Sequence, residues 1–196
     1  AHAVLLSLKS TLRTAQRQGR VAQNVAQPVT VRRDKRRSQR PEVGVDVPTK
    51  DEVRRLVDGA QGRTRAIVVT AVFCGLRSSE LRGLRWDNVD FHNQVIRVRE
   101  RADAWNQHDA PKSEAGNRDV PMTPIVANTL KEWKLQCPIG PDRLVFPNGR
   151  GNHESHANIY KRALAPLEIS QGVVDADGKA KYALHSLRHF CASWLI

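Results

Sequence analysis

The stretch TRAIVVTAVFCGLRSSEL, from Thr64 to Leu81, decides the fold of this chain. Its first part, residues 64–74, is apolar almost all round, and such a pattern is typical of a helix buried on every side. Gly75 follows directly, and glycine most readily takes the left-handed backbone found at helix C-caps. The sequence therefore predicts a buried helix that ends at Gly75.

Arg77 stands two residues after this predicted stop. A short helix is expected from Ser78 or Ser79 to about Arg85, so Arg77 lies at the junction of two helices. Amide donors gather at the start of a helix, where an anion is able to bind. Taken alone, a surface arginine paired with Glu80 is the simpler interpretation.

The flanking patterns indicate further helices and one small antiparallel sheet. Thr49 and Glu52 have the spacing of a capping box, which starts a helix. Residues 95–98 alternate as a strand does. The other expected elements are helices over 123–136 or 129–136, over 156–164 and from His185, a returning strand over 118–121 after a long loop, a turn over 86–90, and a hairpin-like insertion over 175–179. The predicted fold class is mainly α with a small antiparallel β-sheet, an α+β fold.

Length and composition favour a globular protein that binds a polyanion. The 196 residues are 40% apolar, which suits one domain, or one domain and part of another. The net charge of +12 favours nucleic acid over an anionic membrane as the partner. No apolar run reaches the length of a bilayer span. The three cysteines form no C-x-x-C pair, so we expect neither a zinc site nor disulfides, and a reducing cytoplasm fits best.

The positive charge is concentrated in residues 1–41, which hold ten basic residues and one acid. Apolar residues from Val4 to Ala15 recur at helical spacing, and Gly19 is a predicted stop. The basic run that follows cannot bury itself, and we interpret it as a linker that contacts the DNA backbone. A solvated arm or a localisation signal is the alternative. The residues assigned to backbone contact are Arg32, Arg33, Lys35, Arg36 and Arg37.

Two further segments carry residues suited to phosphate chemistry. Lys112 stands at the entry of the turn between the two predicted strands, where a lysine is usually solvated. His185 and Arg188 share one helical face through their i, i+3 spacing. His185 and His189 have the i, i+4 spacing of a metal pair. Because neither a nearby carboxylate nor an H-E-x-x-H pattern accompanies them, no metal site is expected.

Considered together, the three segments that contain Arg77, Lys112 and His185 support a different interpretation from the one that each supports alone. The order G-L-R-x-x-E-L, then K-S-x-x-G-x-R-x-V-P, then H-x-L-R-H resembles the tyrosine recombinases, the phage-integrase family. The resemblance covers residues 43–196. It implies that residues 42–196 are an integrase-type catalytic domain, incomplete at its C-terminus. Residues 1–41 then resemble the last helix of a DNA core-binding domain with its basic linker.

The resemblance implies a site-specific recombinase that cuts and rejoins double-stranded DNA through a 3′-phosphotyrosine, with no metal and no cofactor. Arg77 and Arg188 match the arginines that hold the nonbridging phosphate oxygens, for which planar guanidinium forks are suited. Lys112 matches the hairpin lysine, the general acid for the leaving 5′-oxygen. His185 matches a histidine that assists proton transfer. We interpret Glu80 as orienting Arg77 or His185 from behind.

The chain departs from the family pattern at the nucleophile, a tyrosine that lies beyond H-x-x-R. Its two tyrosines, Tyr160 and Tyr182, both precede that motif, and ordinary half-buried rings are expected for them. Trp194 is too close to Arg188 to serve as the family's second histidine or tryptophan. No nucleophile is therefore expected in this chain, which should bind DNA without cutting it.

Two alternatives stay open. A non-catalytic DNA-binding relative would have little reason to keep all four matching catalytic residues. A type IB topoisomerase-like enzyme would share the phosphate chemistry but act as a monomer. A recombinase, by contrast, is expected to be a monomer in isolation and to assemble four protomers on two duplexes. With no membrane partner expected, it would work in the cytoplasm as a prokaryotic or phage-encoded protein of a mobile element.

Overall fold

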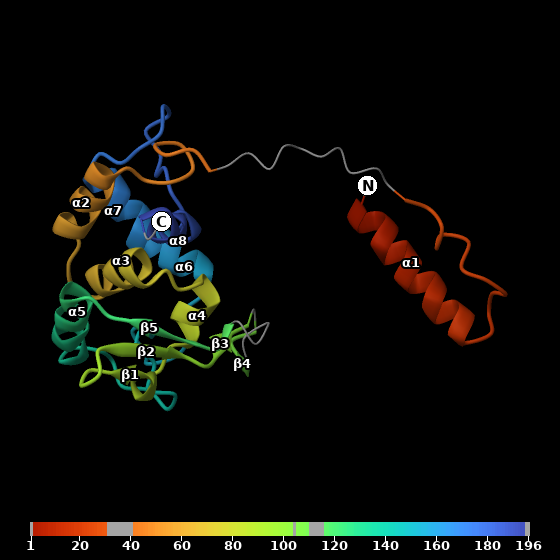
Figure 1. Cartoon of the computed structure of the whole chain (residues 1–196), viewed down its shortest axis with the longest axis horizontal. Helices are drawn as coiled ribbons and strands as arrows, with labels where there is room; N and C mark the ends of the chain where they lie inside the picture. The colour runs from red at the N-terminus through yellow and green to blue at the C-terminus, as the bar shows by residue number, and fades with distance from the viewer. Residues whose placement is uncertain (1, 31–40, 104, 110–115, 195–196) are drawn as a thin grey trace. The chain divides into compact units, whose positions relative to one another are not determined.

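A computed structural model describes residues 2–30, 41–103, 105–109 and 116–194. The chain divides into two compact units, Ala1–Arg40 and Pro41–Ile196, both drawn in Figure 1. Within the described ranges, no helix is long and apolar enough to cross a membrane. Six residues assigned a role from the sequence lie outside the described ranges, namely Arg32, Arg33, Lys35, Arg36, Arg37 and Lys112.

The first unit is built on one helix, α1 (His2–Arg17), as its apolar spacing predicts. Gly19 follows with a φ of 67°, a left-handed backbone that ends the helix. The chain then turns back along α1, where Nζ of Lys9 donates to the carbonyl of Gln27 over 2.9 Å. Val4 stays 71% exposed, so part of the apolar face of α1 has no cover within this unit.

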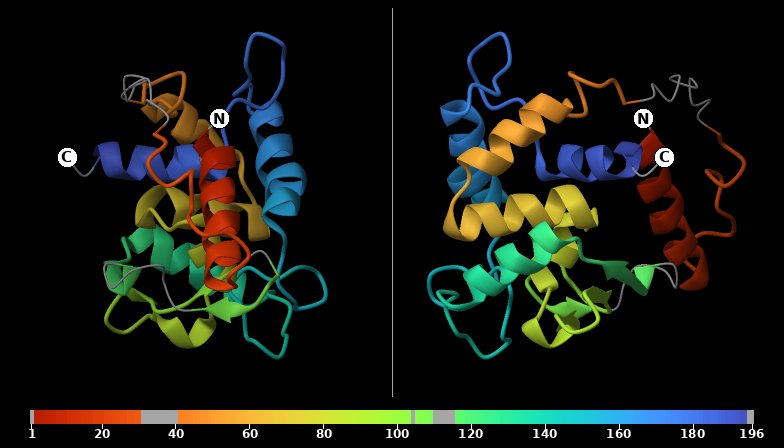
Figure 2. Two further views of the ribbon diagram at one scale, coloured as in Figure 1. Left: turned by 90° about the vertical axis from the view of Figure 1, so that its right-hand side faces the viewer. Right: turned by 60° about the vertical axis from the view of Figure 1, so that its left-hand side comes forward.

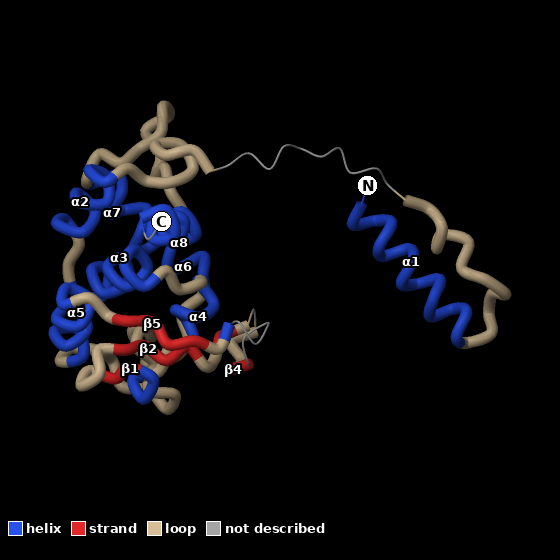
Figure 3. The backbone as a smooth tube through the Cα atoms, in the orientation of Figure 1, coloured by secondary structure: helices blue, strands red, loops and turns tan. Residues whose placement is uncertain are grey.

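The second unit holds the remaining helices and all the described strands. Its helices are α2 (Lys50–Gly59), α3 (Gly62–Cys74), α4 (Ser78–Gly83), α5 (Pro124–Lys134), α6 (His156–Ile159), α7 (Ala165–Ser170) and α8 (Leu184–Trp194). Its strands are β1 (Val89–Asp90), β2 (Val95–Val98), β3 (Arg101–Ala102), β4 (His108–Asp109) and β5 (Arg118–Pro121). Figure 3 shows the strands gathered on one side of this unit. The predicted α+β class, mainly helical with a small antiparallel sheet, is confirmed.

Helix α3 is the centre of the core, as its apolar sequence predicts. Its residues from Ala66 to Val72 are all buried. It packs against α5 on one side and α8 on another, and both views of Figure 2 show these neighbours. Gly75 caps its C-terminus with a left-handed backbone, a φ of 57°. The central helix therefore delivers the segment after Gly75 to a fixed place beside α8.

Helix α2 begins with the predicted capping box. The hydroxyl of Thr49 accepts from the backbone N–H of Glu52 over 3.2 Å, and the Glu52 carboxylate accepts from the Thr49 N–H over 2.8 Å. The same carboxylate accepts from Nζ of Lys181 and from the hydroxyl of Tyr182, each over 2.8 Å. Glu52 thus joins the start of α2 to the segment that leads into α8.

The main sheet has the order β1-β2-β5, and both pairs are antiparallel. The two predicted strands, β2 and β5, are confirmed, with Val98 paired to Arg118. Two expectations need correction. Val89 and Asp90, assigned to a turn, form β1, since they pair with Ile96 and Val95. The predicted long loop contains a second small ladder, in which β3 pairs with β4.

The helix expected over 156–164 continues to Ser170, so its predicted end is wrong. Pro166 lies just beyond that end, and a proline lacks the backbone N–H that an α-helix interior uses. Residues 160–164 form a π-helical turn, in which the N–H of Ala165 donates to the carbonyl of Tyr160. The wider turn changes the hydrogen-bond register just before the proline. The chain therefore runs through Pro166 into α7 without a break.

Candidate active site

Arg77 lies at the junction between α3 and α4. It is the N-cap of α4, and its backbone N–H donates to Oε2 of Glu80 over 2.8 Å. Its Nη1 donates to Oε1 of the same carboxylate over 2.7 Å. The Arg77 side chain remains 52% exposed. Glu80 therefore holds the guanidinium from behind while part of its surface meets solvent.

Glu80 is a buried carboxylate shared by two arginines. Its side chain is 3% exposed, and Arg118 reaches it with a fork in which Nη2 donates to Oε2 over 2.8 Å and Nη1 to Oε1 over 3.1 Å. Burial by itself raises the pKa of Glu80, but the hydrogen bonds from Arg118 and Arg77 outweigh burial and bring that pKa to about 2. Glu80 is thus ionised at neutral pH and anchors both guanidinium groups.

Arg118 is the member of this cluster that sequence reasoning misses. It belongs to the second motif, but the motif by itself gives it no role. A signal was available, because Arg118 and Val120 share one face of β5 and Arg118 pairs with the buried Val98. A charged side chain on the inner face of a strand needs a counter-charge. Glu80 supplies that charge.

Arg188 reaches the same place from α8. Its Nη1 donates to the backbone carbonyl of Gly75, the residue that caps α3. A Cβ at Gly75 would lie 3.0 Å from Sγ of Cys191, so a glycine is needed for α8 to approach this closely. Burial, and next the positive charge of Arg77, lower the pKa of Arg188, whereas Glu80 raises it. The positive charges of Arg188 and Arg77 are therefore close enough to act on each other.

His185 lies on α8, one turn before Arg188. Its ring meets the ring of His189 edge to face, with centroids 4.4 Å apart. Burial, followed by the charges of His189, Arg188 and Arg77, lowers the pKa of His185. Its imidazole is therefore neutral at pH 7 and able to accept a proton.

The geometry favours the binding of an anion. The guanidinium groups of Arg77 and Arg118 share the single carboxylate of Glu80, and Arg188, held at Gly75, adds a third positive charge, so positive charge is in excess. Arg118 and Glu80 neutralise each other in the interior, which leaves the outer donors of Arg77 for a ligand. A phosphate group has the charge and the oxygen geometry that guanidinium donors match.

The two tyrosines lie in different environments. Tyr182 is 2% exposed, and its hydroxyl donates to Glu52 over 2.8 Å. Burial, and then the hydrogen bond to Glu52, raises the pKa of Tyr182 to about 12. The expected half-buried ring is therefore wrong for Tyr182, which serves the core. Tyr160 is half-buried and packs against the core from the π-helical turn.

Integrases and tyrosine recombinases are among the known proteins to which this chain is similar. Residues 47–196 match the phage integrase family. The prophage integrase IntR of Escherichia coli (strain K12) is 32% identical over 98 residues, which are 50% of this chain and 24% of that protein. The tyrosine recombinase XerC of Xylella fastidiosa (strain M23) is 30% identical over 135 residues, 68% of this chain and 40% of that protein. The chain thus spans less than half the length of these relatives.

Solved structures share the fold. The Tn1549 transposon integrase, in complex with a circular intermediate DNA, matches with a TM-score of 0.69 at 21% identity over 99% of this chain and 65% of that chain. The XerA recombinase matches with a TM-score of 0.61 at 23% identity over 76% of this chain and 50% of that chain. The family match covers most of the second unit, including α4, β5 and α8, which position Arg77, Arg118 and Arg188. This chain belongs to the phage integrase family of tyrosine recombinases.

Proposed function

We propose that this chain is the phosphate-binding part of a site-specific recombinase that breaks and rejoins double-stranded DNA through a 3′-phosphotyrosine. The observation that carries the proposal is the pair of anchored arginines at the end of α3, where Glu80 holds Arg77 and the carbonyl of Gly75 holds Arg188 from α8. Phosphoryl transfer places charge on nonbridging oxygens, and fixed donors to that charge lower the barrier.

In this proposal Arg77 and Arg188 bind the two nonbridging oxygens of the scissile phosphate. The Arg77 side chain is half exposed and fixed at its base by Glu80, so its free donors are aimed before the DNA arrives. The hydrogen bond from Arg188 to Gly75 fixes the second guanidinium in the same way. Arg118 and Glu80 are positioning residues, because they hold Arg77 without reaching the phosphate.

Lys112 is the proposed general acid, which gives its proton to the leaving 5′-oxygen. An alkoxide is a poor leaving group, so protonation is needed in the cutting step. His185 is proposed to assist proton transfer at the phosphate. Its lowered pKa supports this role, because a neutral imidazole is available at neutral pH.

The nucleophile is proposed to be a tyrosine outside residues 1–196. Two observations support this. The hydroxyl of Tyr182 is engaged with Glu52, and its pKa of about 12 keeps it protonated. Tyr160 lies on the helical segment between α6 and α7 and packs against the core, whereas the arginines come from α4, β5 and α8. We accordingly expect the 196-residue chain to form no covalent adduct with a nicked suicide substrate. An adduct at Tyr160 or Tyr182 would contradict this assignment.

The proposed partner is double-stranded DNA, on which four protomers assemble across two duplexes, with a monomer in isolation. The excess of basic residues in positions 1–41 supports backbone contact. The Tn1549 integrase was solved with DNA, and DNA is proposed for this chain by likeness. As a phage or bacterial recombinase of a mobile element, the protein would act on DNA in the cytoplasm.

The test uses a longer protein that continues this chain, and a supercoiled plasmid with two copies of its recombination site. Exchange into two circles supports the proposal. Relaxation without exchange would instead indicate a topoisomerase-like enzyme, and occupancy of the site without strand breakage would indicate a non-catalytic relative. Arg77→Gln should abolish exchange and Arg97→Gln, on β2, should leave it nearly intact, because Arg97 pairs with Asp90 away from the cluster.

A further inference from the structure

A second group of chemically reactive side chains lies away from the arginine cluster. His108 of β4 meets Asp142 and His153, both in the connection between α5 and α6. One nitrogen or oxygen atom of each residue lies within 4.8 Å of the others. The side chains of His153 and His108 are 7% and 17% exposed, whereas Asp142 is 38% exposed. The two histidine side chains are thus largely buried, and the Asp142 side chain is the most exposed of the three.

The distances within this group are too long for hydrogen bonds. Nε2 of His108 lies 4.0 Å from Oδ1 of Asp142, and Nδ1 of His153 lies 3.8 Å from Oδ2. The Nε2 atoms of both histidines are buried and have no hydrogen-bond partner among the described residues. Ligands of a tetrahedral ion at about 2.0–2.1 Å are about 3.3 Å apart. The two pairs with Asp142 would therefore have to contract by roughly 0.5–0.7 Å, and the two histidines by up to about 1.5 Å, to reach the spacing of a metal site.

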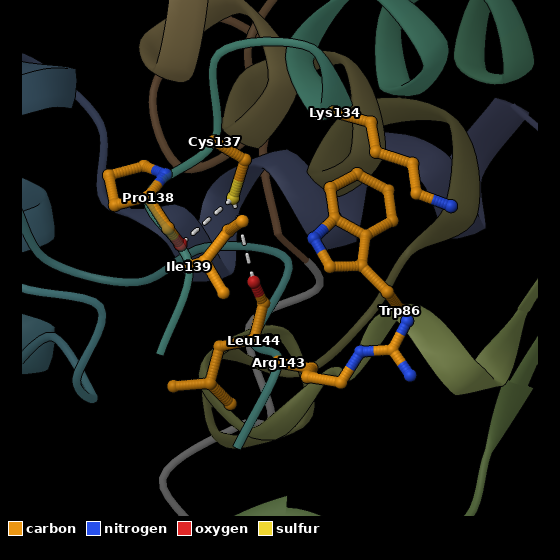
Figure 4. A pocket seen from close by; sticks show the side chains of 7 residues that line it. All are labelled: Trp86, Lys134, Cys137, Pro138, Ile139, Arg143 and Leu144. Atoms are coloured by element: carbon orange, nitrogen blue, oxygen red, sulfur yellow. Dashed lines mark hydrogen bonds between the residues drawn. The ribbon is translucent and has the colours of Figure 1, made fainter. Parts of the chain in front are cut away.

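The connection that carries Asp142 and His153 folds back on itself, and its two arms pass very close to each other. A Cβ at Gly140 would lie 2.0 Å from the carbonyl oxygen of Gly151, so glycine is required where the two arms of this connection touch. The same connection lines a hollow of about 170 Å³ with Cys137 and Leu144, among others (Figure 4), and Sγ of Cys137 lies 3.6 Å from the carbonyl oxygen of Leu144. Asp142 therefore lies between two places where the chain is held by close contacts.

The charges around the group are of both signs. Oε2 of Glu100 lies 2.9 Å from Nδ1 of His108, on the side of the ring away from Asp142. The two atoms do not have hydrogen-bond geometry here, but a small rotation of the ring would let this carboxylate orient a metal-binding imidazole and strengthen it as a ligand. Two arginines lie near the group. Arg85 has its Nε 3.3 Å from Glu100 and its Nη2 4.0 Å from Asp142. Arg82 donates to the carbonyl of Glu154 over 2.7 Å, and its positive charge also acts on His153.

We propose that His108, Asp142 and His153 bind one divalent transition-metal ion of the zinc class, with water as the remaining ligand. Two imidazoles and one carboxylate are the donor set that such ions take in proteins. When the ion is bound, Arg85 retains its ion pair with Glu100 and loses its weaker ion pair with Asp142. The ion fixes β4 to the connection between α5 and α6.

The experiment titrates Zn²⁺ alone into the chelator-treated 196-residue protein and measures bound zinc by equilibrium dialysis. One ion per chain is expected, together with a rise in the unfolding temperature. Asp142→Asn keeps the size of a partly exposed side chain and should weaken binding at least tenfold. His153→Gln should do the same, and Glu100→Gln should weaken binding by about 10–100-fold. His92→Gln, at an exposed histidine outside the group, should bind as the wild type does.

Three results would overturn the proposal. The first is no zinc uptake by the wild-type protein. The second is full uptake by both Asp142→Asn and His153→Gln. The third is uptake that survives Asp142→Asn but is abolished in Cys137→Ser or His189→Ala, which would move the ion to the thiol or to the histidine pair of α8.

Discussion

Glu80 illustrates how one buried side chain serves several partners. Its carboxylate caps α4 through the N–H of Arg77, pairs with the guanidinium of Arg77, and receives the fork of Arg118. A buried carboxylate with these bonds gives stability that depends on its ionisation. Its pKa of about 2 in the folded protein lies below the ordinary value of 4.5.

The sign of this difference gives the first prediction. The stabilisation is fully present above the unfolded pKa of 4.5 and is lost as pH falls toward the folded pKa of about 2. Urea unfolding of the wild type should therefore show a drop in unfolding free energy between about pH 5 and pH 2. Glu80→Gln should be less stable at pH 7, on the order of 2 kcal/mol, with a shallower acid slope.

Glu168 serves as the control for Glu80, because its pKa is shifted in the opposite direction. It is fully buried, and burial raises its pKa to about 7 against the hydrogen bonds from Tyr182 and Lys181. Stability contributed by its protonated form is lost as pH rises from 4.5 to about 7. Glu168→Gln should remove this loss and leave the acid drop in place. Parallel pH curves for the wild type and both variants would contradict both assignments.

A second prediction separates charge from shape at Arg77. Arg77→Lys keeps the positive charge but cannot reproduce a planar fork with paired donors. Cleavage by the longer protein should fall by about 10²–10³, the usual effect of losing one fixed donor to developing charge. Single-turnover cleavage is the measurement, with Arg97→Lys as control. A variant within a few-fold of the wild type would show that the fork is not needed.

The third prediction concerns the proposed acid. Lys112→Ala should slow cleavage of ordinary DNA by about 10²–10⁴, the typical contribution of a general acid. A 5′-bridging phosphorothioate should restore the rate, because a thiolate leaves without a proton. Arg77→Ala should gain no such rescue, since its contact is with other oxygens. Equal rescue of both variants, or of neither, would remove Lys112 from that role.

Local motifs predict some residues of the candidate site and miss the one that depends on pairing in space. Arg77, Glu80 and Arg188 stand out because their segments match a pattern. Arg118 does not, because its role arises from the register that sets it opposite Val98 and over Glu80. Likewise, the contacts among His108, Asp142 and His153 join two distant stretches, and no local spacing predicts them.

At the scale of the element, the junction between α3 and α8 depends on a single glycine. Gly75 has a φ of 57°, and Gly62, at the other end of α3, has a similar φ of 50°. The two differ in their surroundings, because a Cβ at Gly75 would meet Cys191, whereas nothing lies within 4 Å of one at Gly62. Only Gly75 also supplies a carbonyl to Arg188.

The fourth prediction compares alanine at these two positions. Gly62→Ala should cost about 1 kcal/mol, the strain of a left-handed backbone with a side chain. Gly75→Ala should cost clearly more, because α8 must also move away. Urea unfolding measures both costs, and cleavage by the longer protein should fall in Gly75→Ala alone. Equal destabilisation would show that the approach of α8 tolerates a methyl group.

Helix limits are predictable from the sequence where a local motif marks them. Thr49 and Glu52 form a local capping box, so the sequence alone locates the start of α2. The end expected near Leu164 is wrong because the rule for proline assumes α-helical hydrogen bonding, and a π-helical turn before Pro166 removes that assumption. The short strands β1, β3 and β4 have two residues each, too few for an alternation to be recognised.

At the scale of the whole molecule, charge is divided unequally between the two units. Residues 1–41 hold ten basic residues and one acid, whereas the rest of the chain holds 22 basic residues and 19 acids. Nonspecific DNA affinity is largely the release of counterions by such residues. The first unit is therefore expected to supply most of that affinity.

The fifth prediction tests this division. Deleting residues 1–40 should weaken duplex binding, and the slope of log K against log salt should fall by about 0.9 for each phosphate that these residues neutralise. Changing Arg32, Arg33, Lys35, Arg36 and Arg37 to Gln should reproduce most of the effect. Changing Lys9, Arg13 and Arg17 of α1 should do less. An unchanged slope after the deletion would mean that residues 1–40 do not touch DNA.

The shared carboxylate also restricts how this chain changes over generations. Loss of Glu80 leaves Arg77 and Arg118 without their common counter-charge, and loss of Arg118 leaves a buried carboxylate with one partner. Either step alone costs roughly 1–3 kcal/mol, against the ~5–15 kcal/mol that keeps a domain folded. The two codons are therefore tied to each other, and a lineage that replaces one must acquire the second mutation before selection removes the first.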